Sequence, residues 1–167
     1  AMCEGGYEGM VAKAAQSPYR GERTRDWLKI KCIQRQEFVI GGWRPSQKKS
    51  TFASLLLGTW EGSKLVYRGR VGTGFNAGSA GELQRKLNAR ARKTSPFADA
   101  PRDISRRANW VSPELVGEIA LTELTPDGHL RHPSFTGLRE DKKSREVRLE
   151  KPTSAAAKPQ AKAKAKP

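Results

Sequence analysis

Residues whose side chains suit phosphate chemistry lie near the start of the sequence. A carboxylate and an ammonium group bracket the segment Glu8-Gly9-Met10-Val11-Ala12-Lys13, which is otherwise apolar and predicts a strand. A carboxylate holds a hard divalent cation and a lysine meets phosphate charge, so the pair suits a magnesium nucleotide. Taken alone, a glutamate and a lysine on a solvent-facing edge strand are commoner than such a site.

A pair of lysines follows in the segment Trp27-Leu28-Lys29-Ile30-Lys31-Cys32-Ile33, which alternates apolar and basic residues with the period of a strand. Lys29 and Lys31 would then share a strand face, about 7 Å apart. Two like charges at that distance repel unless an anion lies in front of them. An ordinary solvated face is the alternative interpretation.

A third charged segment lies near the C-terminal end of the sequence, in Phe135-Thr136-Gly137-Leu138-Arg139-Glu140-Asp141-Lys142-Lys143. Arg139 has the planar fork that grips phosphate oxygens, Asp141 can orient a neighbour, and Lys142 adds a point charge. By itself this segment could equally be a charged loop.

The overall charge indicates a polyanionic partner. Lys and Arg number 32 against 17 Asp and Glu, for a net charge of +15. Five of these charges come from lysines in residues 151–167, a Lys/Ala/Pro stretch without acids, which predicts a flexible tail or linker. Two thirds of the excess therefore belongs to the rest of the chain, and nucleic acid is the expected partner.

Residues 34–150 are predicted to form a single, mostly β domain. Short apolar runs at 37–43, 54–60 and 64–71 are typical of strands, and Glu61-Gly62-Ser63 is a hairpin turn between the last two. A second hairpin is predicted from 115–124 and 130–135. Five strands with one inserted helix fit an oligonucleotide-binding (OB) barrel, while a β-sandwich or an SH3-like barrel are the alternatives.

The inserted helix is predicted between the two hairpins. Ser79 is its expected N-cap, with Glu82 completing a capping box. Leu83 and Leu87 lie on one face, and the basic residues from Arg90 to Lys93 are expected in the last turn. The basic residues Arg85, Lys86, Arg90, Arg92 and Lys93 are expected to be mainly solvated, with contact to DNA phosphate as the minority alternative.

The cysteines and the hydropathy restrict the class of protein. Cys3 and Cys32 form no closely spaced pair, which argues against a disulfide scaffold or a zinc ribbon and fits a reducing cytoplasm. No apolar run approaches the roughly 18 residues of a membrane span. The chain starts at Ala1 rather than Met, and we expect it to be part of a longer protein.

Considered together, the three charged segments resemble the final motifs of the covalent nucleotidyltransferases. The order is Glu-Gly-x-x-x-Lys, then Lys-x-Lys, then a β domain, then Arg-x-Asp-Lys. The resemblance is greatest to ATP-dependent DNA ligases of the bacterial ligase D type and covers about residues 4–150. Further segments that carry it are Ser17-Pro18-Tyr19, Phe38-Val39-Ile40-Gly41-Gly42-Trp43, Gly69-Arg70-Val71-Gly72-Thr73-Gly74-Phe75 and His132-Pro133-Ser134-Phe135.

This resemblance implies a fold and a partner set. Residues 1–33 would be the end of an adenylation (nucleotidyltransferase) domain, 34–150 the OB domain, and 151–167 the flexible tail. The implied activity is sealing of nicks and ends in duplex DNA with ATP and Mg²⁺ or Mn²⁺, through an adenylate intermediate. Implied partners are the upstream adenylation domain, polymerase and phosphoesterase domains, and the end-binding protein Ku, in the bacterial cytoplasm at the nucleoid.

The resemblance also implies roles for single residues. Glu8 would bind or position the catalytic metal, and Lys13 would lie near the nucleotide. Lys29 and Lys31 would contact the α-phosphate of the adenylate. The group Arg139, Asp141 and Lys142 would orient the leaving pyrophosphate.

The sequence departs from the family in two places. The attacking lysine stands in Lys-x-Asp-Gly, whereas at Asp127-Gly128 that lysine is replaced by Thr125, so this chain alone is expected to form no adenylate. Many relatives also carry an arginine near Thr136 and Gly137, although ligase D proteins commonly lack it.

DNA contact is expected on the central hairpin, through Lys64, Arg68 and Arg70. A function from another class also fits, because an OB module can bind DNA or RNA through a basic face without catalysis.

Overall fold

The computed structural model describes residues 9–16, 27–48 and 51–150. The described residues divide into two compact units: residues 9–16 and 27–32 belong to the first, and residues 33–48 and 51–150 to the second. The predicted metal ligand Glu8 and the predicted tail at 151–167 lie outside the described residues. Among the residues that are described, no helix has the length and apolar character needed to cross a membrane.

The described part of the first unit is an antiparallel hairpin of strands β1 (Gly9–Lys13) and β2 (Trp27–Lys31). Val11 pairs with Lys29, and Met10 pairs with Ile30. Side chains alternate between the two faces of a strand. One face therefore has only apolar positions, and the other has the three lysine positions together with those of Val11 and Trp27.

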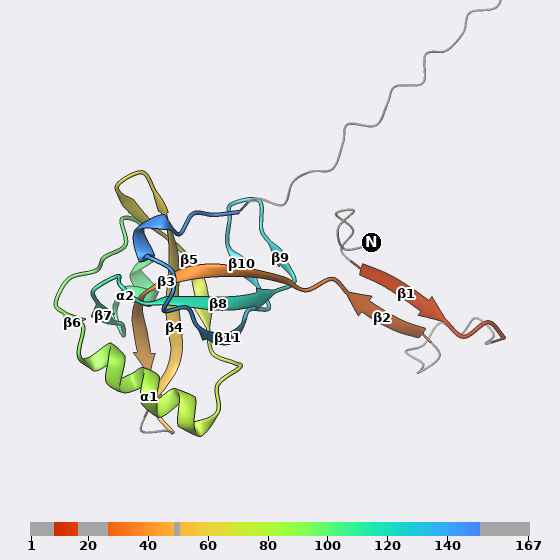
Figure 1. Ribbon diagram of the computed structural model, residues 1–167, viewed down its shortest axis with the longest axis horizontal. Coiled ribbons are helices and arrows are strands. Elements are labelled where there is room, and N and C mark those ends of the chain that lie inside the picture. Colours follow the sequence, from red (N-terminus) through yellow and green to blue (C-terminus); the bar gives the residue numbers. More distant parts are fainter. Residues whose placement is uncertain (1–8, 17–26, 49–50, 151–167) are drawn as a thin grey trace, which may run out of the picture. The chain divides into compact units, whose positions relative to one another are not determined.

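The second unit is built on five antiparallel strands (Figure 1). Their order is β11-β8-β3-β4-β5, so that the chain's first long strand lies in the middle. The strands are β3 (Gln34–Pro45), β4 (Phe52–Glu61), β5 (Lys64–Val71), β8 (Val116–Leu121) and β11 (Ser134–Leu138). The predicted hairpin turn between β4 and β5 is confirmed, because Glu61 pairs with Lys64.

The two ends of this strand path meet. The Phe135 N–H donates to the carbonyl oxygen of Thr73 at 3.0 Å, and the Thr73 hydroxyl donates to the Pro133 carbonyl at 3.1 Å. These bonds join the segment after β5 to the start of β11. Gly74 makes the approach possible, because its φ is +90° and a Cβ there would lie 2.2 Å from the Phe135 oxygen. The predicted mainly β OB barrel is confirmed.

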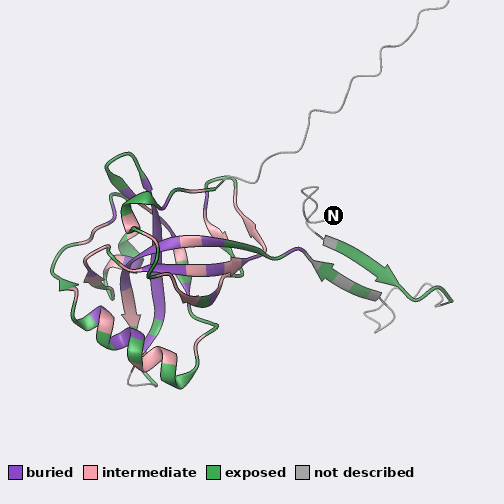
Figure 2. Ribbon diagram, viewed as in Figure 1, coloured by how far each residue is buried: buried purple, intermediate pink, exposed green. Residues whose placement is uncertain are grey.

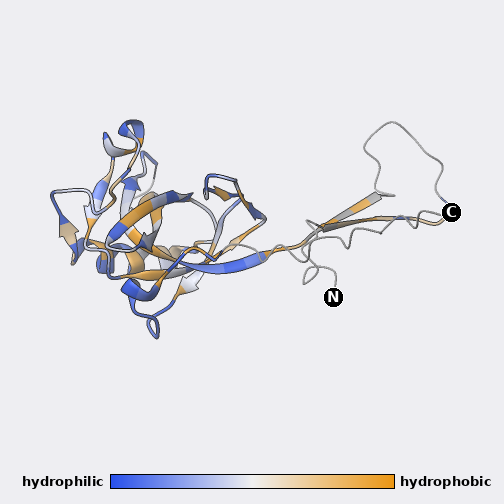
Figure 3. Ribbon diagram, turned by 90° about the horizontal axis from the view of Figure 1, so that it is seen from above, coloured by the Kyte–Doolittle hydropathy of each residue, from blue (hydrophilic) through white to orange (hydrophobic). Residues whose placement is uncertain are grey.

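The barrel strands are buried on both faces, which explains the unbroken apolar run in β4. Alternate residues serve two clusters: Phe38 and Leu55 belong to the first, and Val39 and Leu56 to the second. Buried residues alternate with intermediate ones along several of these strands in Figure 2, and the hydrophobic colours of Figure 3 lie mainly on strands. Register shifts near Gly41 and Gly42 let β3 curl around the first cluster.

Helix α1 (Ala77–Asn88) closes the first cluster with Leu83 and Leu87, as expected, but its ends differ from the prediction. Asn76 is the N-cap: its side chain accepts from the Ser79 N–H at 2.8 Å, while the Ser79 hydroxyl accepts from the Asn76 N–H. Asparagine three residues earlier caps at least as well as serine, so Ser79 takes the third helical position. The last turn contains Arg85 and Lys86 instead of Arg90 to Lys93.

Short elements complete the unit. β8 pairs with β11, so the second predicted hairpin is confirmed, and a smaller hairpin of β9 (Glu123–Leu124) and β10 (Leu130–Arg131) lies within it. The remaining elements cover the second cluster or connect the strands: β6 (Ala91–Arg92), α2 (Arg102–Ser105), β7 (Asn109–Val111) and a 3-10 turn at Ser144–Glu146.

Cys32 is disulfide-bonded in the structure. The sequence analysis argued only against a disulfide scaffold and did not anticipate this bond. Cysteines distant in sequence leave no spacing pattern that predicts such a bond.

The barrel closure gives a stability prediction. Replacing Gly74 with alanine should lower the free energy of unfolding by about 2–3 kcal/mol, because the added Cβ meets the Phe135 backbone at a positive φ. Urea unfolding of the chain measures the effect. Gly81→Ala is the matched control: it lies in α1 with open space around it and should stabilise by about 0.5–1 kcal/mol. Equal midpoints for Gly74→Ala and the parent chain would contradict the closure.

Candidate phosphate-binding site

The loop that carries Arg139, Asp141 and Lys142 follows directly from the last barrel strand. β11 ends at Leu138, and the Arg139 N–H still donates to the Val116 carbonyl of β8 at 2.8 Å. Farther along, the Val147 carbonyl accepts from the Trp60 N–H at 2.9 Å. Both ends of the loop are therefore held on the barrel by backbone hydrogen bonds.

The three residues predicted from the sequence lie together. Arg139 donates to Asp141 through two nitrogens, from Nε to Oδ1 at 3.0 Å and from Nη2 to Oδ2 at 2.9 Å. Such a paired contact fixes the plane of the guanidinium. The fork is therefore oriented before any ligand arrives.

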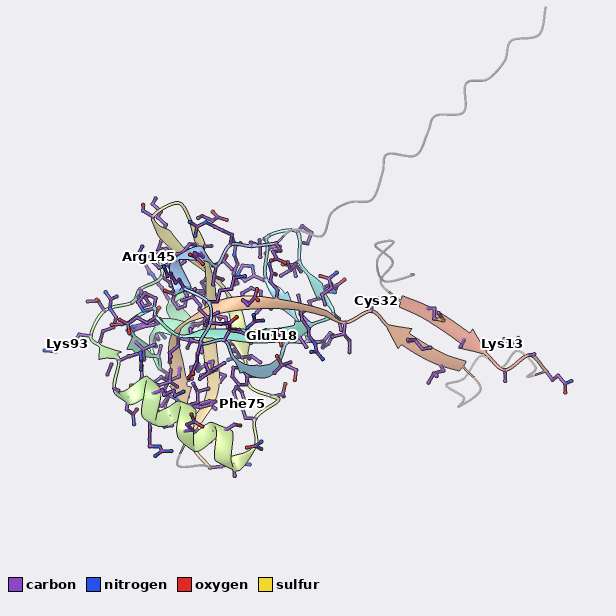
Figure 4. The ribbon with its side chains drawn as sticks, in the orientation of Figure 1. Lys13, Cys32, Phe75, Lys93, Glu118 and Arg145 are labelled. Atoms are coloured by element: carbon purple, nitrogen blue, oxygen red, sulfur yellow. The ribbon has the colours of Figure 1, made fainter. Side chains whose placement is uncertain are left out.

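Two carboxylates that the sequence analysis missed complete the cluster. Arg139 Nη1 lies 3.2 Å from Glu37 Oε1 and 3.4 Å from Glu118 Oε1, and Lys142 Nζ lies 3.5 Å from Glu37 Oε2. Glu37 and Glu118 are direct partners across β3 and β8 (Glu118 is labelled in Figure 4). Glutamates directly opposite each other repel, so this pair needs the cations beside it.

The contact between Arg139 and Asp141 shifts the pKa values of both side chains. Hydrogen bonding to Arg139 lowers the pKa of Asp141 to about 2, and a hydrogen bond from the Asp141 backbone adds to this. The same contact raises the pKa of the Arg139 guanidinium. Arg139 and Asp141 are therefore both charged at physiological pH.

The remaining nucleotide-site residues predicted from the sequence belong to the hairpin of the first unit. Lys29 and Lys31 lie on β2, where they pair with Val11 and Gly9, and Lys13 ends β1 with an exposed side chain. By register, Lys13, Lys29 and Lys31 occupy positions of one hairpin face. That Lys13 joins the other two could not be derived from strand period alone, because it depends on the register between strands.

In the described ranges, no three His, Cys, Asp or Glu side chains are grouped so that they could hold a metal ion.

The predicted DNA-binding residues of β5 divide into two kinds. Lys64 and Arg70 are exposed. Arg68 is only 5% exposed. Its Nε donates to the Thr59 hydroxyl at 2.9 Å and its Nη2 pairs with Glu61, so its side chain bonds within the barrel and is not available to DNA. The prediction assigned all three residues to DNA contact. The structure has a register shift between β4 and β5 at which Arg68 has no register partner, and this irregularity lets its side chain turn inward.

A basic groove was missed by the sequence analysis. Arg44, Lys48, Arg70 and Arg107 line a surface hollow of about 570 Å³. None of these four side chains pairs with a carboxylate of the described residues, and no acid lines the hollow. The four come from distant parts of the chain, so only their shared positive sign was visible in the sequence.

The fold and these two sites define a basic OB domain with a pre-oriented arginine fork at the end of its last strand. Comparisons with known proteins agree. The family described as the ATP dependent DNA ligase C terminal region matches residues 48–142.

The multifunctional non-homologous end joining protein LigD of Pseudomonas aeruginosa is 40% identical over 156 residues, covering 90% of this chain and 18% of that protein. The LigD protein of Mycolicibacterium smegmatis is 43% identical over 145 residues, covering 84% and 19%. The crystal structure of the M. tuberculosis LigD ligase domain gives a TM-score of 0.70 at 40% identity, covering 87% of this chain and 48% of that chain.

The chain therefore belongs to the family of ATP-dependent DNA ligase C-terminal regions, and within it resembles ligase D. It spans less than a fifth of the LigD relatives, at 18% and 19%, and about half of the ligase domain, at 48%. A second solved relative, mycobacterial DNA ligase D complexed with ATP and MES, gives a TM-score of 0.64 at 39% identity.

The ion pair gives a pH prediction. A carbon-detected NMR titration should show the Asp141 carboxyl with a midpoint of about 2, and Arg139→Ala should move it towards the ordinary 3.8. Because the folded pKa is lowered, the stability contributed by Asp141 is present above pH 3.8 and is lost as the pH falls towards 2.

Asp127 is the internal control for this titration. Its pKa is lowered by its own backbone and by Thr125, without Arg139, and should be unaffected by the substitution. An Asp141 midpoint that ignores Arg139→Ala would show that the pair does not form in solution.

Proposed function

We propose that this chain is the C-terminal part of an ATP-dependent DNA ligase of the ligase D type, which seals nicks and ends in DNA through an adenylate intermediate. The observation that carries the proposal is the oriented Arg139 fork with Lys142 at the end of the OB barrel. Each step of such a reaction moves a highly charged phosphoryl group, for which fixed cations are the appropriate stabilising groups.

Residues 1–33 are proposed to complete the adenylation domain, with 34–150 as the OB domain. The hairpin supports this assignment, because its apolar positions are left uncovered: Met10 is 41%, Leu28 62% and Ile30 44% exposed. Register places these residues on one face, and the three lysines occupy positions of the other. An apolar face of this kind suits the interior of a larger sheet domain supplied by the rest of the protein.

On the basic face, Lys29 and Lys31 are proposed to contact the α-phosphate of the adenylate, with Lys13 beside the nucleotide. Glu8 is proposed to bind or position Mg²⁺ or Mn²⁺, which would neutralise charge on the phosphates. Since the described residues hold no metal cluster, the other ligands would come from the adenylation domain and the nucleotide.

Arg139 and Lys142 are proposed to contact the pyrophosphate that leaves when ATP reacts, with Asp141 keeping the fork in its plane. Their position on the OB domain makes this contact dependent on domain closure. The barrel can then turn another surface to DNA once the pyrophosphate has left.

That other surface is proposed to be the basic groove, together with Lys64. A hollow lined by Arg44, Lys48, Arg70 and Arg107 offers positive charge that no carboxylate of the described residues neutralises. Phosphates of a duplex supply the matching charge, and their contact would release condensed counterions.

The same groove supports a second candidate function, that of an OB module that binds DNA or RNA without catalysis. The groove lies wholly within the barrel unit, so binding requires nothing from residues 1–32. Nick sealing after addition of the missing adenylation domain separates the two candidates.

The role of the relatives in non-homologous end joining supports placing the parent protein in double-strand break repair in the bacterial cytoplasm, at the nucleoid. Polymerase and phosphoesterase domains and the protein Ku are proposed partners by resemblance.

The catalytic assignment predicts step-specific defects in the ligase joined to its adenylation domain. Lys29→Ala or Lys31→Ala should reduce both self-adenylation and sealing by about 10²–10³-fold, because each removes a charge contact to the reacting phosphate. Arg139→Ala should slow self-adenylation strongly but leave sealing of a pre-adenylated nick within a few fold. Single-turnover assays of the two steps measure this, and the reverse order would contradict the role of Arg139.

The groove predicts a change in salt dependence. Replacing Arg44, Arg70 and Arg107 with glutamine should weaken binding of a short duplex and flatten its dependence on salt. The log–log slope should fall by about 0.9 for each phosphate that the variant no longer neutralises. Fluorescence anisotropy at several salt concentrations measures both.

Arg85, Arg92 and Lys93 provide the matched control, since all three are exposed and their replacement removes the same charge; Lys93 is labelled in Figure 4. An equal weakening in both triple variants would show that binding depends on net charge alone.

A further inference from the structure

The cations beside Arg139 differ from those of the basic groove in how they are paired. A second hollow, of about 280 Å³, is lined by Lys86, Arg90, Arg139 and Lys142. Every one of these four contacts a carboxylate: Lys86 lies 2.6 Å from Glu140, Arg90 lies 3.0 Å from Glu114, and Arg139 and Lys142 share Glu37. In the basic groove, by contrast, the four cations have no such partner among the described residues.

We propose that Glu37 and Glu118 are positioning residues that act as built-in competitor anions, reserving Arg139 and Lys142 for a polyphosphate and excluding single DNA phosphates. This inference rests on the proposed function, in which Arg139 meets pyrophosphate. It adds that two barrel residues outside the Arg139–Lys142 loop select which phosphate compounds can bind there.

The contacts of Arg139 leave no nitrogen unengaged. Nε and Nη2 bond to Asp141, and Nη1 lies within 3.4 Å of both Glu37 and Glu118. A guanidinium has five N–H donors, and the second hydrogen of Nη2 has no acceptor among the described residues, so a single phosphate oxygen can still approach there. A bidentate grip on the fork, however, requires a carboxylate oxygen to be displaced. Asp141 grips two nitrogens in a fixed plane, whereas the Glu37 and Glu118 contacts share one nitrogen at longer distances and are the ones to exchange.

Further contacts hold the Glu37 and Glu118 carboxylates in place on the barrel. The Thr136 hydroxyl lies 2.8 Å from Glu118 Oε2 and 2.9 Å from the Glu118 carbonyl oxygen. Glu37 has a side chain only 17% exposed and engages Arg139 with one oxygen and Lys142 with the other. Because both residues project from paired barrel strands, neither can follow the loop away from the wall.

Charge decides which anion can win the exchange. Three carboxylates surround two cations, so the cluster carries a net charge of −1 before a ligand binds. A phosphodiester brings one negative charge, no more than the carboxylate that it replaces. Pyrophosphate or triphosphate brings several charges and can engage Arg139 and Lys142 together, so it alone gains from the displacement.

Binding of inorganic triphosphate to the complete chain tests the inference. Glu37→Gln and Glu118→Gln should each tighten binding by about three- to tenfold, because each removes one competing charge near the fork. Isothermal titration calorimetry gives the affinity, and the Arg139 Nε–H resonance reports the site. A merely structural role would instead weaken binding or lower the thermal midpoint.

Two control variants distinguish competition by Glu37 and Glu118 from a general effect of net charge. Glu123→Gln also removes a carboxylate paired with an arginine, Arg131 at 2.6 Å, but outside the cluster, and should leave triphosphate affinity within about twofold. Glu37→Asp retains the charge on a shorter side chain, so it should tighten triphosphate binding less than Glu37→Gln does. Equal tightening by Glu123→Gln and Glu37→Gln would overturn the inference.

Arg139→Ala distinguishes this inference from the proposed function. If it leaves triphosphate affinity unchanged, or if the parent chain binds no triphosphate, the phosphate role of Arg139 fails and the inference fails with it. If Arg139→Ala weakens binding but Glu37→Gln and Glu118→Gln do not tighten it, the competitor device alone is refuted.

A short duplex is the second probe. In the parent chain it should leave the Arg139 Nε–H resonance in place, whereas in Glu37→Gln it should shift that resonance. A duplex that shifts the resonance of the parent chain as far as triphosphate does would show that Glu37 and Glu118 do not exclude DNA.

Discussion

The pairing of β3 with β8 places two glutamates directly opposite each other on the barrel. The charged cluster around Arg139 depends on that contact. Glu37 and Glu118 are register partners, and neither is more than 25% exposed. Their repulsion is offset by the cations that the loop after β11 brings to them. The barrel wall and the loop that carries Arg139 are therefore stabilised by the same charges.

This dependence explains why the loop has a defined structure without a ligand. The loop is short, exposed and highly charged, and such segments are usually mobile. Here backbone bonds to Val116 and Trp60 hold its two ends, while Arg139 is fixed between Asp141 and the barrel carboxylates. Arg145 adds a cation–π contact over the Trp60 ring at 4.1 Å, on the segment that leaves the loop. Orientation of the fork thus precedes phosphate binding, which lowers the entropic cost of binding.

The barrel carries two basic surfaces with different electrostatic character. Cations near Arg139 are neutralised by protein carboxylates, and those near Arg70 have no such partner among the described residues. The proposed function requires this difference, because two identical bare surfaces would both bind a long polyanion such as DNA. The apolar face of the β1–β2 hairpin belongs to a third interaction, the one within the adenylation domain that we propose the hairpin completes.

The sequence by itself determined the elements and the local chemistry. Strand periodicity and turn residues placed the hairpins, and the spacing from Arg139 to Lys142 is short enough for one loop to bring those groups together. The N-cap was missed because Asn76 and Ser79 both suit helix starts, and the structure selects the earlier one. Tertiary structure alone decided which distant residues meet. Glu37 and Glu118 are 81 positions apart and become neighbours through strand register, and Arg68 turns inward at a register shift between β4 and β5. Register and bulges arise from packing of the whole barrel, so no local pattern in the sequence encodes them.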